Sequence, residues 1–548
     1  MPQVSASSCR SGRWRVWPSG AVEGAVVRRT PPHPTSPGPT PPEPTPSRRT
    51  AVRRKAVRRT ATRRAALLGL PAAALVAALL PATGQAAPAE GAPATGAAAE
   101  TATGVAEPAA AEVAPFASGD DVIANLWSWN WSSVAAECTD VLGPAGYAAV
   151  WVAPPHESLA EPSGAWWDLY QPFSYQLSGR LGSESEFAAM TSACNAAGVR
   201  VYTDAVINHT AAIGGTGYAG TQISDKYQPP MYERADYNVD ICDREISDYN
   251  NLWEVQNCEL LGLPDLSTDD PGVRAEIVGY LNSQIALGVS GFRVDAAKHM
   301  PAADLEAIVG ALDSTADGSP PFVFHEVFPG ATPQPDEYFG SGRVLDFAVG
   351  DQLKGAFQGD IAQLTGFGPG LLPAENAVAF VTNHDTERDG RHLTYRDGDT
   401  AVLANVFQLA WSEAPPTVYA GFEYANRDDS PPAGEGGFVT DTDCSAGWYC
   451  LNRDPRITGM VAWRNATAGD GGVGEIQSPR GNVIGFDRGS GFVAINNATE
   501  AASVQFATQL PDGSYDDLLS EGGLQATVSG GQLTVELPAK SAIAVHAG

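Results

Sequence analysis

Short apolar runs alternate with amphipathic stretches between about residues 122 and 422. Helical periodicity separates the runs, for example at 185–197, 273–287 and 302–312. This alternation predicts an α/β fold, and eight such strands favour a closed (β/α)8 TIM barrel over an open doubly wound sheet. The predicted strands are Val122–Trp127, Tyr147–Val152, Arg200–Ile207, Gly291–Val294, Phe322–His325, Arg343–Phe347, Val378–Thr382 and Pro416–Ala420.

Two parts of the chain depart from this alternation. The connection at about 208–268, after the third strand, is rich in Asp, Asn and Tyr, and its length predicts an inserted subdomain. At 466–548, short strands with Gly turns predict a C-terminal antiparallel β-sandwich domain. The barrel domain is therefore expected at 119–465. The strands expected in the sandwich are Val483–Phe486, Gly491–Ile495, Ser503–Phe506, Gly531–Glu536 and Ala542–His546.

The first 118 residues lack the pattern of a folded domain. Residues 1–50 are rich in Pro, Thr, Ser and Arg and cannot bury enough apolar surface to order themselves. A basic stretch at 53–64 then precedes the apolar run 65–80, as in a secretory signal, and the run is short for a membrane span. We predict a disordered basic tail plus secretion signal at 1–86 and a low-complexity linker at 87–118. The processed protein is then secreted and extracellular, without stable membrane association.

The charge of the chain is divided along its length. The 548 residues carry a formal net charge of −29, but segment 1–86 holds 14 Lys and Arg against 2 acids, and the remainder carries −41. An acidic body excludes a general nucleic-acid binder and an anchor to anionic lipid, because both need a basic surface. It keeps the protein soluble and suits a neutral or cationic partner.

Six of the seven cysteines lie beyond the basic segment. An even number in an exported chain favours disulfides over free thiols. No Cys-x-x-Cys pair or His/Cys cluster indicates a zinc site. Spacing alone does not choose among the connectivities that six cysteines allow. The six are Cys138, Cys194, Cys242, Cys258, Cys444 and Cys450.

Charged residues follow the predicted barrel strands at their carboxyl ends, where barrel chemistry gathers. Asp295, Glu326 and Asp385 close three different strands and are expected to converge on one mouth. One such acid would usually form a structural ion pair, but three of them with flanking His and Arg favour a functional site. Converging carboxylates suit glycoside hydrolysis, in which one attacks or activates water and another protonates the leaving oxygen. Metal-assisted phosphoryl transfer is the alternative, although it expects more basic residues than Arg293 and Lys298.

Aromatic residues after the second strand add a clue to the substrate. Trp166, Trp167, Tyr170 and Gln171 lie in a Gly/Pro-flanked loop above the same mouth. Tryptophans are often buried in cores, but an adjacent pair in such a loop favours a platform for the apolar faces of sugar rings. The stretch 127–131 is interpreted as packing.

Four segments of this sequence resemble the signatures of the alpha-amylase family, glycoside hydrolase family 13. They are Asp204-x-x-x-Asn208-His209, Gly291-Phe-Arg-Val-Asp295-Ala-Ala-Lys298-His299, His325-Glu326-Val and Val381-Thr-Asn-His384-Asp385. They occur in family order and at family-like spacing. The Lys298-His299 pair is similar to that of alpha-amylases proper, and Leu263-Pro-Asp265-Leu resembles a further family segment.

The resemblance implies a role for each of these residues. Asp295 would be the nucleophile, Glu326 the general acid and then base, and Asp385 the group that stabilises the transition state. Arg293 would keep Asp295 ionised. His209 and His384 would bind the sugar at the cleavage point, and Lys298 would serve the reducing-end side.

The resemblance also implies a calcium ion and three disulfides. Asn208 and Asp265 would give side-chain oxygens to Ca2+, and Gln256 and His299 would give backbone carbonyls, which suits a hard cation. The implied disulfides are Cys138–Cys194, Cys242–Cys258 and Cys444–Cys450. The second of these would staple the insertion that carries the calcium.

Some relatives bind chloride, and here the resemblance departs from them. Arg293 and Asn383 occupy two of the chloride-binding positions, but the third appears as Glu423, which would repel chloride and could pair with Arg293. Chloride is therefore not expected as a cofactor.

The leading interpretation is a monomeric, retaining enzyme that hydrolyses internal α-1,4-glucosidic bonds of starch-like glucans. The alternatives are a maltooligosaccharide-forming or transglycosylating member of the same family, and a catalytically silent glucan-binding protein that keeps the fold.

Overall fold

The computed structural model describes residues 121–548, except 162–163, 331, 470 and 521–522. The expectations for the basic tail, the secretion signal and the linker concern residues outside the described part. None of the helices in the described part combines the length and apolar character that a membrane crossing requires.

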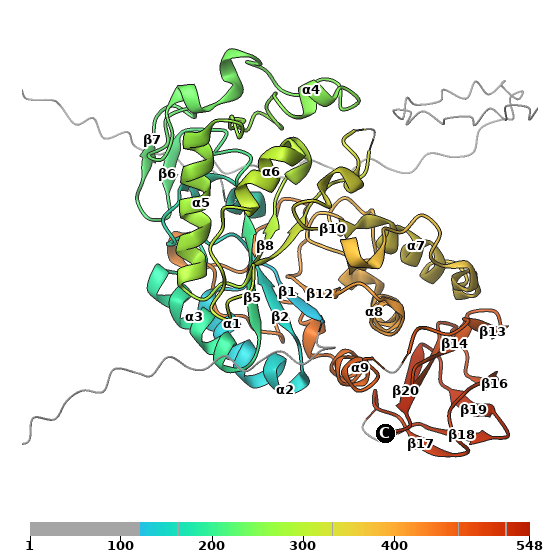
Figure 1. Cartoon of the computed structure of the whole chain (residues 1–548). Coiled ribbons are helices and arrows are strands. Elements are labelled where there is room, and N and C mark those ends of the chain that lie inside the picture. The colour runs from blue at the N-terminus through green and yellow to red at the C-terminus, as the bar shows by residue number, and fades with distance from the viewer. Residues whose placement is uncertain (1–120, 162–163, 331, 470, 521–522) are drawn as a thin grey trace, which may run out of the picture. The chain divides into compact units, whose positions relative to one another are not determined.

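Eight parallel strands close into a barrel, which confirms the predicted (β/α)8 fold (Figure 1). The closing pair joins the first strand to the last, with Ile123 opposite Thr417 and Leu126 opposite Ala420. The order around the barrel is β1-β12-β11-β10-β9-β8-β5-β2. The strands are β1 Ile123–Leu126, β2 Ala149–Val152, β5 Arg200–Ala205, β8 Gly291–Val294, β9 Phe322–His325, β10 Arg343–Asp346, β11 Ala377–Phe380 and β12 Pro416–Ala420.

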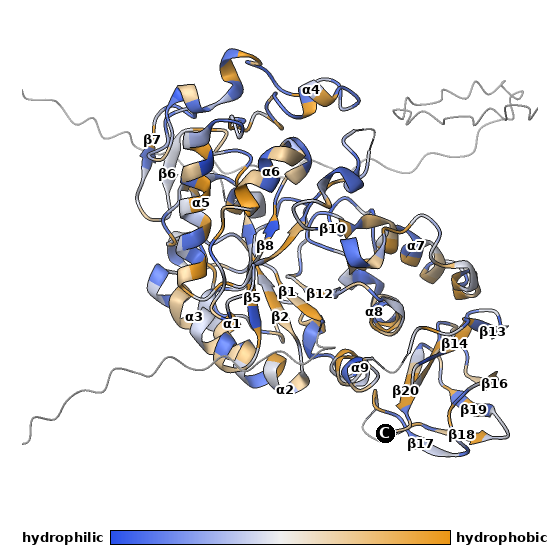
Figure 2. Ribbon diagram, in the orientation of Figure 1, coloured by the Kyte–Doolittle hydropathy of each residue, from blue (hydrophilic) through white to orange (hydrophobic). Residues whose placement is uncertain are grey.

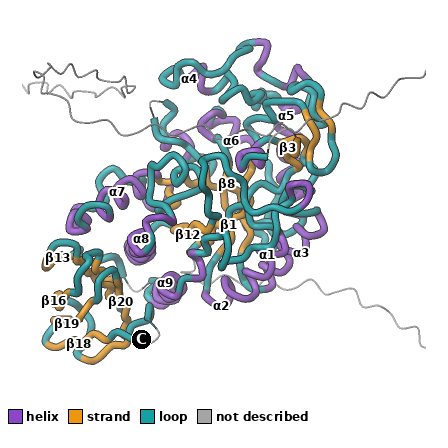
Figure 3. Tube along the Cα trace, turned by 180° about the vertical axis from the view of Figure 1, so that it is seen from behind, coloured by secondary structure: helices purple, strands orange, loops and turns teal. Residues whose placement is uncertain are grey.

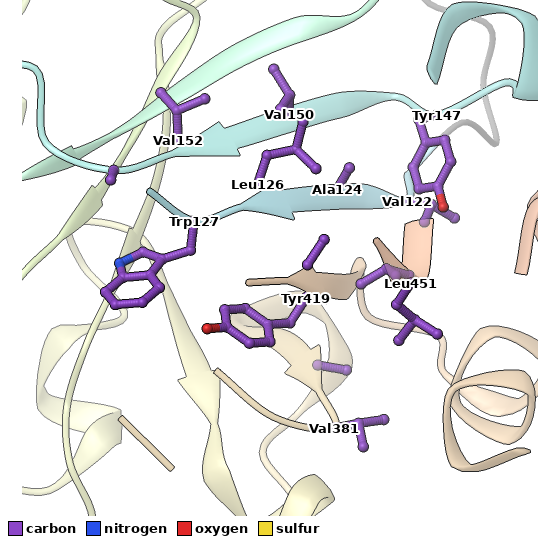
Figure 4. Close-up of a cluster of buried hydrophobic side chains, with 14 of the residues drawn as sticks. Val122, Ala124, Leu126, Trp127, Tyr147, Val150, Val152, Val381, Tyr419 and Leu451 are labelled. Atoms are coloured by element: carbon purple, nitrogen blue, oxygen red, sulfur yellow. The ribbon is translucent and has the colours of Figure 1, made fainter. Parts of the chain in front are cut away.

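The barrel strands are buried on both faces, as their nearly continuous apolar runs require. Figure 2 shows the hydrophobic colour concentrated on the strands and on one side of the surrounding helices. A close-up of β1 and β2 shows Val122, Ala124, Leu126, Val150 and Val152 packed along one layer of this core (Figure 4). The helices of the described part are α1 Trp131–Glu137, α2 Gly143–Ala145, α3 Glu184–Ala196, α4 Leu252–Val255, α5 Pro271–Ala286, α6 Ala302–Val309, α7 Phe347–Phe357, α8 Asp399–Trp411 and α9 Pro455–Ala466.

The chain between β5 and α5 forms the expected insertion, which consists mostly of loops and turns (Figure 3). It contains α4 and two short strands that join β3 and β4 from the loop after β2 in a small sheet, in the order β4-β3-β6-β7. The Cys242–Cys258 disulfide closes one loop of the insertion, and Cys138–Cys194 and Cys444–Cys450 are also bonded, as the family resemblance implied. The four strands are β3 Glu157–Glu161, β4 Pro172–Ser174, β6 Gly215–Gly217 and β7 Gln222–Ile223.

The C-terminal residues form two four-stranded antiparallel sheets, which confirms the predicted all-β domain. Side chains from both sheets share one core, in which Phe492 and Phe506 lie 5.4 Å apart between ring centroids. One sheet has the order β13-β14-β15-β20, and the other has β16-β19-β18-β17. Their strands are β13 Gln477–Arg480, β14 Val483–Arg488, β15 Gly491–Asn496, β20 Ser541–His546, β16 Ala502–Ala507, β19 Gln532–Leu537, β18 Gln525–Ser529 and β17 Gly513–Asp516.

Candidate active site

Arg293 lies at the centre of the acidic cluster, fully buried in β8. Its Nη1 lies 2.6 Å from Asp204 Oδ1 in β5 and donates a 2.7 Å hydrogen bond to Asp295 Oδ1, just after β8. Its Nη2 lies 3.0 Å from Glu326 Oε2, just after β9. Because β5, β8 and β9 are neighbours in the barrel, one guanidinium brings carboxylates from three strands together.

The acids of this cluster outnumber their cation, and burial disfavours their charged forms. Burial raises the pKa of Asp204 to about 7 and also raises the pKa of Asp295, against the opposing attraction of Arg293. Burial and the neighbouring Glu326 raise the pKa of Asp385 to about 8. The cluster can therefore hold a proton near neutral pH, as an acid–base site requires.

The segment after β11 places Asp385 in the same cavity as Glu326. Asn383 Oδ1 accepts hydrogen bonds from the backbone N–H groups of Asp385 and Thr386 and so fixes this turn. His384 Nε2 lies 3.3 Å from Asp385 Oδ2. Burial strongly lowers the pKa of His384, so the imidazole stays neutral.

A cavity of about 340 Å3 opens above these carboxylates. A second cavity of about 440 Å3 shares with it Trp166, Trp167, Tyr170 and Asp385, so the two are lobes of one cleft. The first lobe continues past Glu326 and Lys298 to Tyr249 and Phe328, and the second continues to Gln171, Ile213 and Arg427. A cleft that extends on both sides of the acids can hold a chain on both sides of a cleaved bond.

The remaining residues expected to bind substrate also lie at the cleft. Trp167 is 36% exposed, whereas Trp166 is almost fully buried and exposes little of its ring. His209 lines the first lobe, with its Nε2 3.1 Å from the Tyr170 carbonyl oxygen. Lys298 Nζ donates to the Phe328 carbonyl oxygen. Gln171 Oε1 accepts from the Ala212 backbone N–H, so this side chain also holds the neighbouring loop.

The residues expected to hold calcium lie where the insertion meets β5. Asn208 and Asp265 come together because the Leu266 N–H donates to the Asn208 carbonyl oxygen. Their Oδ1 atoms are both buried and accept no hydrogen bond from a described residue. Gln256 caps the C-terminal end of α4, and His299 Nδ1 lies 2.9 Å from the carbonyl oxygen of Val255, the last residue of that helix.

These oxygens fit a cation that prefers hard ligands. Two buried, unsatisfied side-chain oxygens are costly unless a cation or water binds them. Burial raises the pKa of Asp265 to about 8, which indicates that an ionised Asp265 needs a counter-charge. Within the described residues, no group of three or more His, Cys, Asp or Glu side chains could hold a metal. The set at Asn208 and Asp265, with amide and carbonyl oxygens, suits Ca2+ rather than a transition metal.

The expected pairing of Glu423 with Arg293 is wrong. Glu423 is exposed, whereas the carboxylates around the fully buried Arg293 are Asp204, Asp295 and Glu326. Asp204 was missed as a site residue because it lies within a strand rather than after its end. The expectation of no chloride activation stays a prediction.

Residues 139–320 match the family described as alpha amylase, catalytic domain, and residues 476–548 match the alpha amylase C-terminal all-beta domain. An alpha-amylase of Streptomyces violaceus is 44% identical over 453 residues, which cover 81% of this chain and 77% of the relative. An alpha-amylase of Thermomonospora curvata is 42% identical over 81% of this chain and 76% of the relative.

Solved structures agree with the sequence relatives. Wild-type alpha-amylase I of Eisenia fetida has a TM-score of 0.74 and 33% identity, over 78% of this chain and 97% of that one. A variant of the same enzyme, solved as a maltohexaose complex, aligns equally well. Sequence, barrel and C-terminal domain together show that this chain belongs to the alpha-amylase family and is a glycoside hydrolase.

Proposed function

We propose that the protein hydrolyses internal α-1,4-glucosidic bonds of starch, glycogen and related glucans, with retention at the anomeric carbon. The observation that carries this proposal is the Arg293-centred group of carboxylates on the floor of a cleft with two lobes. The two lobes suit an internal bond, because sugar units must lie on both sides of it. The maltohexaose bound by the Eisenia fetida relative supports a linear glucan as substrate.

In the proposed mechanism, Asp295 attacks the anomeric carbon while Glu326 protonates the leaving glycosidic oxygen. A covalent glycosyl-enzyme forms, and Glu326 then takes a proton from the water that hydrolyses it. Both carboxylates lie within 3.0 Å of Arg293 nitrogens, so they stay close together, as a retaining reaction needs. Asp385 binds substrate hydroxyls and stabilises the charged transition state.

The other cleft residues position the sugar chain. His209 and His384 bind the sugar at the cleavage point, and Trp166, Trp167 and Tyr170 offer aromatic surface to its rings. Gln171 contributes to the second lobe. Glu326, which protonates the leaving oxygen, lines only the first lobe. The leaving part of the sugar chain therefore occupies that lobe, where Lys298 binds it.

We also propose that Asn208, Asp265 and the backbone carbonyls of Gln256 and His299 hold a Ca2+ ion that fixes the insertion to the barrel. The supporting observation is the pair of unsatisfied Oδ1 atoms. A chelator should lower the melting temperature, because a ligand of the native state stabilises it by mass action. An unchanged melting temperature in excess chelator would contradict the site.

Asp295→Asn tests the catalytic proposal. The substitution keeps the size of the side chain and removes the nucleophile, so release of reducing sugar from soluble starch should fall by several orders of magnitude. Equal rates for the variant and the original protein would refute catalysis by Asp295. That result would leave a silent glucan-binding protein as the alternative.

Product analysis separates the main proposal from its closest alternative. An endo-acting hydrolase lowers the viscosity of starch early and releases a range of chain lengths. A single dominant oligosaccharide, or products longer than an added maltooligosaccharide substrate, would favour the maltooligosaccharide-forming or transglycosylating alternative.

The three disulfides support a secreted, extracellular location. We further propose that the enzyme is a monomer, which size-exclusion chromatography with light scattering tests.

A further inference from the structure

Trp127 follows β1 directly and is fully buried beneath the cleft. It lines neither lobe, so it does not offer a surface to a bound sugar chain. The sequence pattern favours a packing role for Trp127, and Figure 4 shows its ring beside Tyr419 at the end of the β1 core layer. Its polar atom, however, takes part in a chain of hydrogen bonds that ends at the candidate nucleophile.

The hydrogen bonds run from the indole to the acidic cluster. Trp127 Nε1 donates to Tyr170 Oη at 3.0 Å, and Tyr170 Oη donates to Asp204 Oδ2 at 2.9 Å. Arg293 Nη1 then joins Asp204 Oδ1 to Asp295 Oδ1. All five side chains are buried, and because Trp127, Asp204 and Arg293 line neither lobe, these three cannot exchange their partners for water without local opening.

The indole ring also supports the sugar-binding histidine from behind. The Trp127 and His384 rings are stacked, with centroids 4.8 Å apart and planes 9° from parallel. Tyr170 and His384 are also stacked, at 5.2 Å and 13°. Phe422 stacks with Trp127 at 5.4 Å, and the Arg388 guanidinium lies 5.3 Å from its ring centroid. Trp127 therefore contacts three cleft residues: Tyr170 through its N–H, His384 through its face, and Trp166 edge-to-face with ring centroids 5.4 Å apart.

We propose that Trp127 is a positioning residue for catalysis, which acts through the Tyr170 hydroxyl on the Asp204–Arg293–Asp295 network. A tyrosine hydroxyl has one proton and can turn about its C–O bond. When the indole N–H occupies a lone pair of this oxygen, the hydroxyl proton is directed to Asp204. Without that donor the hydroxyl is free to turn, and Asp204 is no longer fixed by it. Arg293, which contacts both Asp204 and Asp295, then holds Asp295 less firmly in place.

Trp127→Phe tests this proposal, which rests on the proposed function. Phenylalanine keeps an aromatic face against His384 but removes the N–H donor. One hydrogen bond of ordinary strength corresponds to a fall in kcat of about two- to tenfold. KM on maltoheptaose should change by less than about twofold, because Trp127 does not contact the substrate.

Trp129→Phe is the matched control. Trp129 is equally buried two residues away and packs edge-to-face on Trp448, but its Nε1 donates to no described residue. Both variants lose the same ring atoms from the same core, but only Trp127→Phe also loses a hydrogen bond, so its thermal stability should fall somewhat more. Only the Trp127 variant should lose kcat. An equal loss of kcat in both variants would overturn the proposal.

A double-mutant cycle with Tyr170→Phe shows whether the effect passes through the hydroxyl. If it does, Trp127→Phe lowers kcat no further in the Tyr170→Phe protein. A further fall equal to that in the original protein would overturn the proposed route. Should Trp127→Phe fail to fold, the benzothiophene isostere of tryptophan at position 127 keeps the bicyclic ring and removes the N–H.

The outcomes also separate this inference from the proposed function. Full activity of Asp295→Asn would remove the catalytic proposal itself. An inactive Asp295→Asn together with an unchanged kcat for Trp127→Phe would remove only the positioning role.

Discussion

Glu387 is a buried acid that takes no part in the proposed reaction. Its ionisation at high pH lowers the stability of the folded protein. It is 4% exposed, and its Oε1 accepts a 2.8 Å hydrogen bond from Tyr419 Oη. Burial raises the pKa of Glu387 from 4.5 to about 7. The folded protein therefore holds this proton more tightly than the unfolded chain does. The stability that this carboxyl contributes is present below about pH 4.5 and is lost as the pH rises through 7.

Glu387→Gln removes the titrating group and keeps an oxygen that can accept from Tyr419. At pH 8, the ionised carboxylate costs about 3 kcal/mol relative to a group with an unshifted pKa, and at pH 5 it costs less than about 1 kcal/mol. The free energy of unfolding of the variant should therefore exceed that of the original protein by about 3 kcal/mol at pH 8. The gain should nearly vanish at pH 5.

Denaturant unfolding of both proteins at pH 5 and pH 8 measures this difference. Glu137→Gln is the control, because Glu137 is also buried but pairs with Arg453, whose Nε lies 2.8 and 2.9 Å from its two oxygens. Breaking that pair should destabilise the protein at pH 8. The reasoning is refuted if Glu387→Gln gives the same difference at both pH values, or if it destabilises the protein at pH 8.

Three further predictions concern the insertion, the cleft and chloride. Replacing Cys242 and Cys258 by serine reopens a loop of 16 residues, which should destabilise the insertion by about 3 kcal/mol; unchanged hydrogen-exchange protection there would contradict this. Trp167→Ala should raise KM for maltoheptaose about two- to tenfold with little change in kcat, since this ring offers exposed stacking surface; an unchanged KM would exclude a sugar contact. Added chloride should leave the rate unchanged, because carboxylates already surround Arg293, and a clear activation would show that an anion binds there.

The barrel could be predicted because each of its strands is buried on both faces. Such strands read as continuous apolar runs, and all eight expected ranges overlap the observed strands, with ends that differ by up to two residues. The small sheet beside the insertion was not predicted. Its strands are two to five residues long, and Gly215–Gly217 has no apolar side chain that could show a period. The sandwich strands β13, β17 and β18 were missed for a related reason, since β13 and β17 bury little of their side chains and β18 buries only Ala526 and Val528.

The three carboxylates of the site could be predicted because they come after barrel strands, Asp295 and Glu326 directly and Asp385 five residues beyond the end of β11. The resemblance also implied the pairing of Asp295 with Arg293, which the structure contains, but the other partners could not be predicted. Asp204 lies within β5 and Trp127 one residue beyond β1, and only the closed barrel brings both to Tyr170. Position relative to a strand end shows which residues face the mouth, but not which hydrogen bonds they form. The expected pairing of Glu423 with Arg293 failed for the same reason.

The seam between β1 and β12 makes the barrel depend on residues far from it in sequence. Arg464, in α9, donates to the carboxylate of Asp121 just before β1 and to the Leu409 and Ser412 carbonyl oxygens at the end of α8. Arg488, in the C-terminal domain, donates to the same Ser412 oxygen. The C-terminal domain thus fastens α8, the helix that precedes the last barrel strand, and an engineer who shortens this enzyme from its C-terminal side would loosen the ring that holds the catalytic groups.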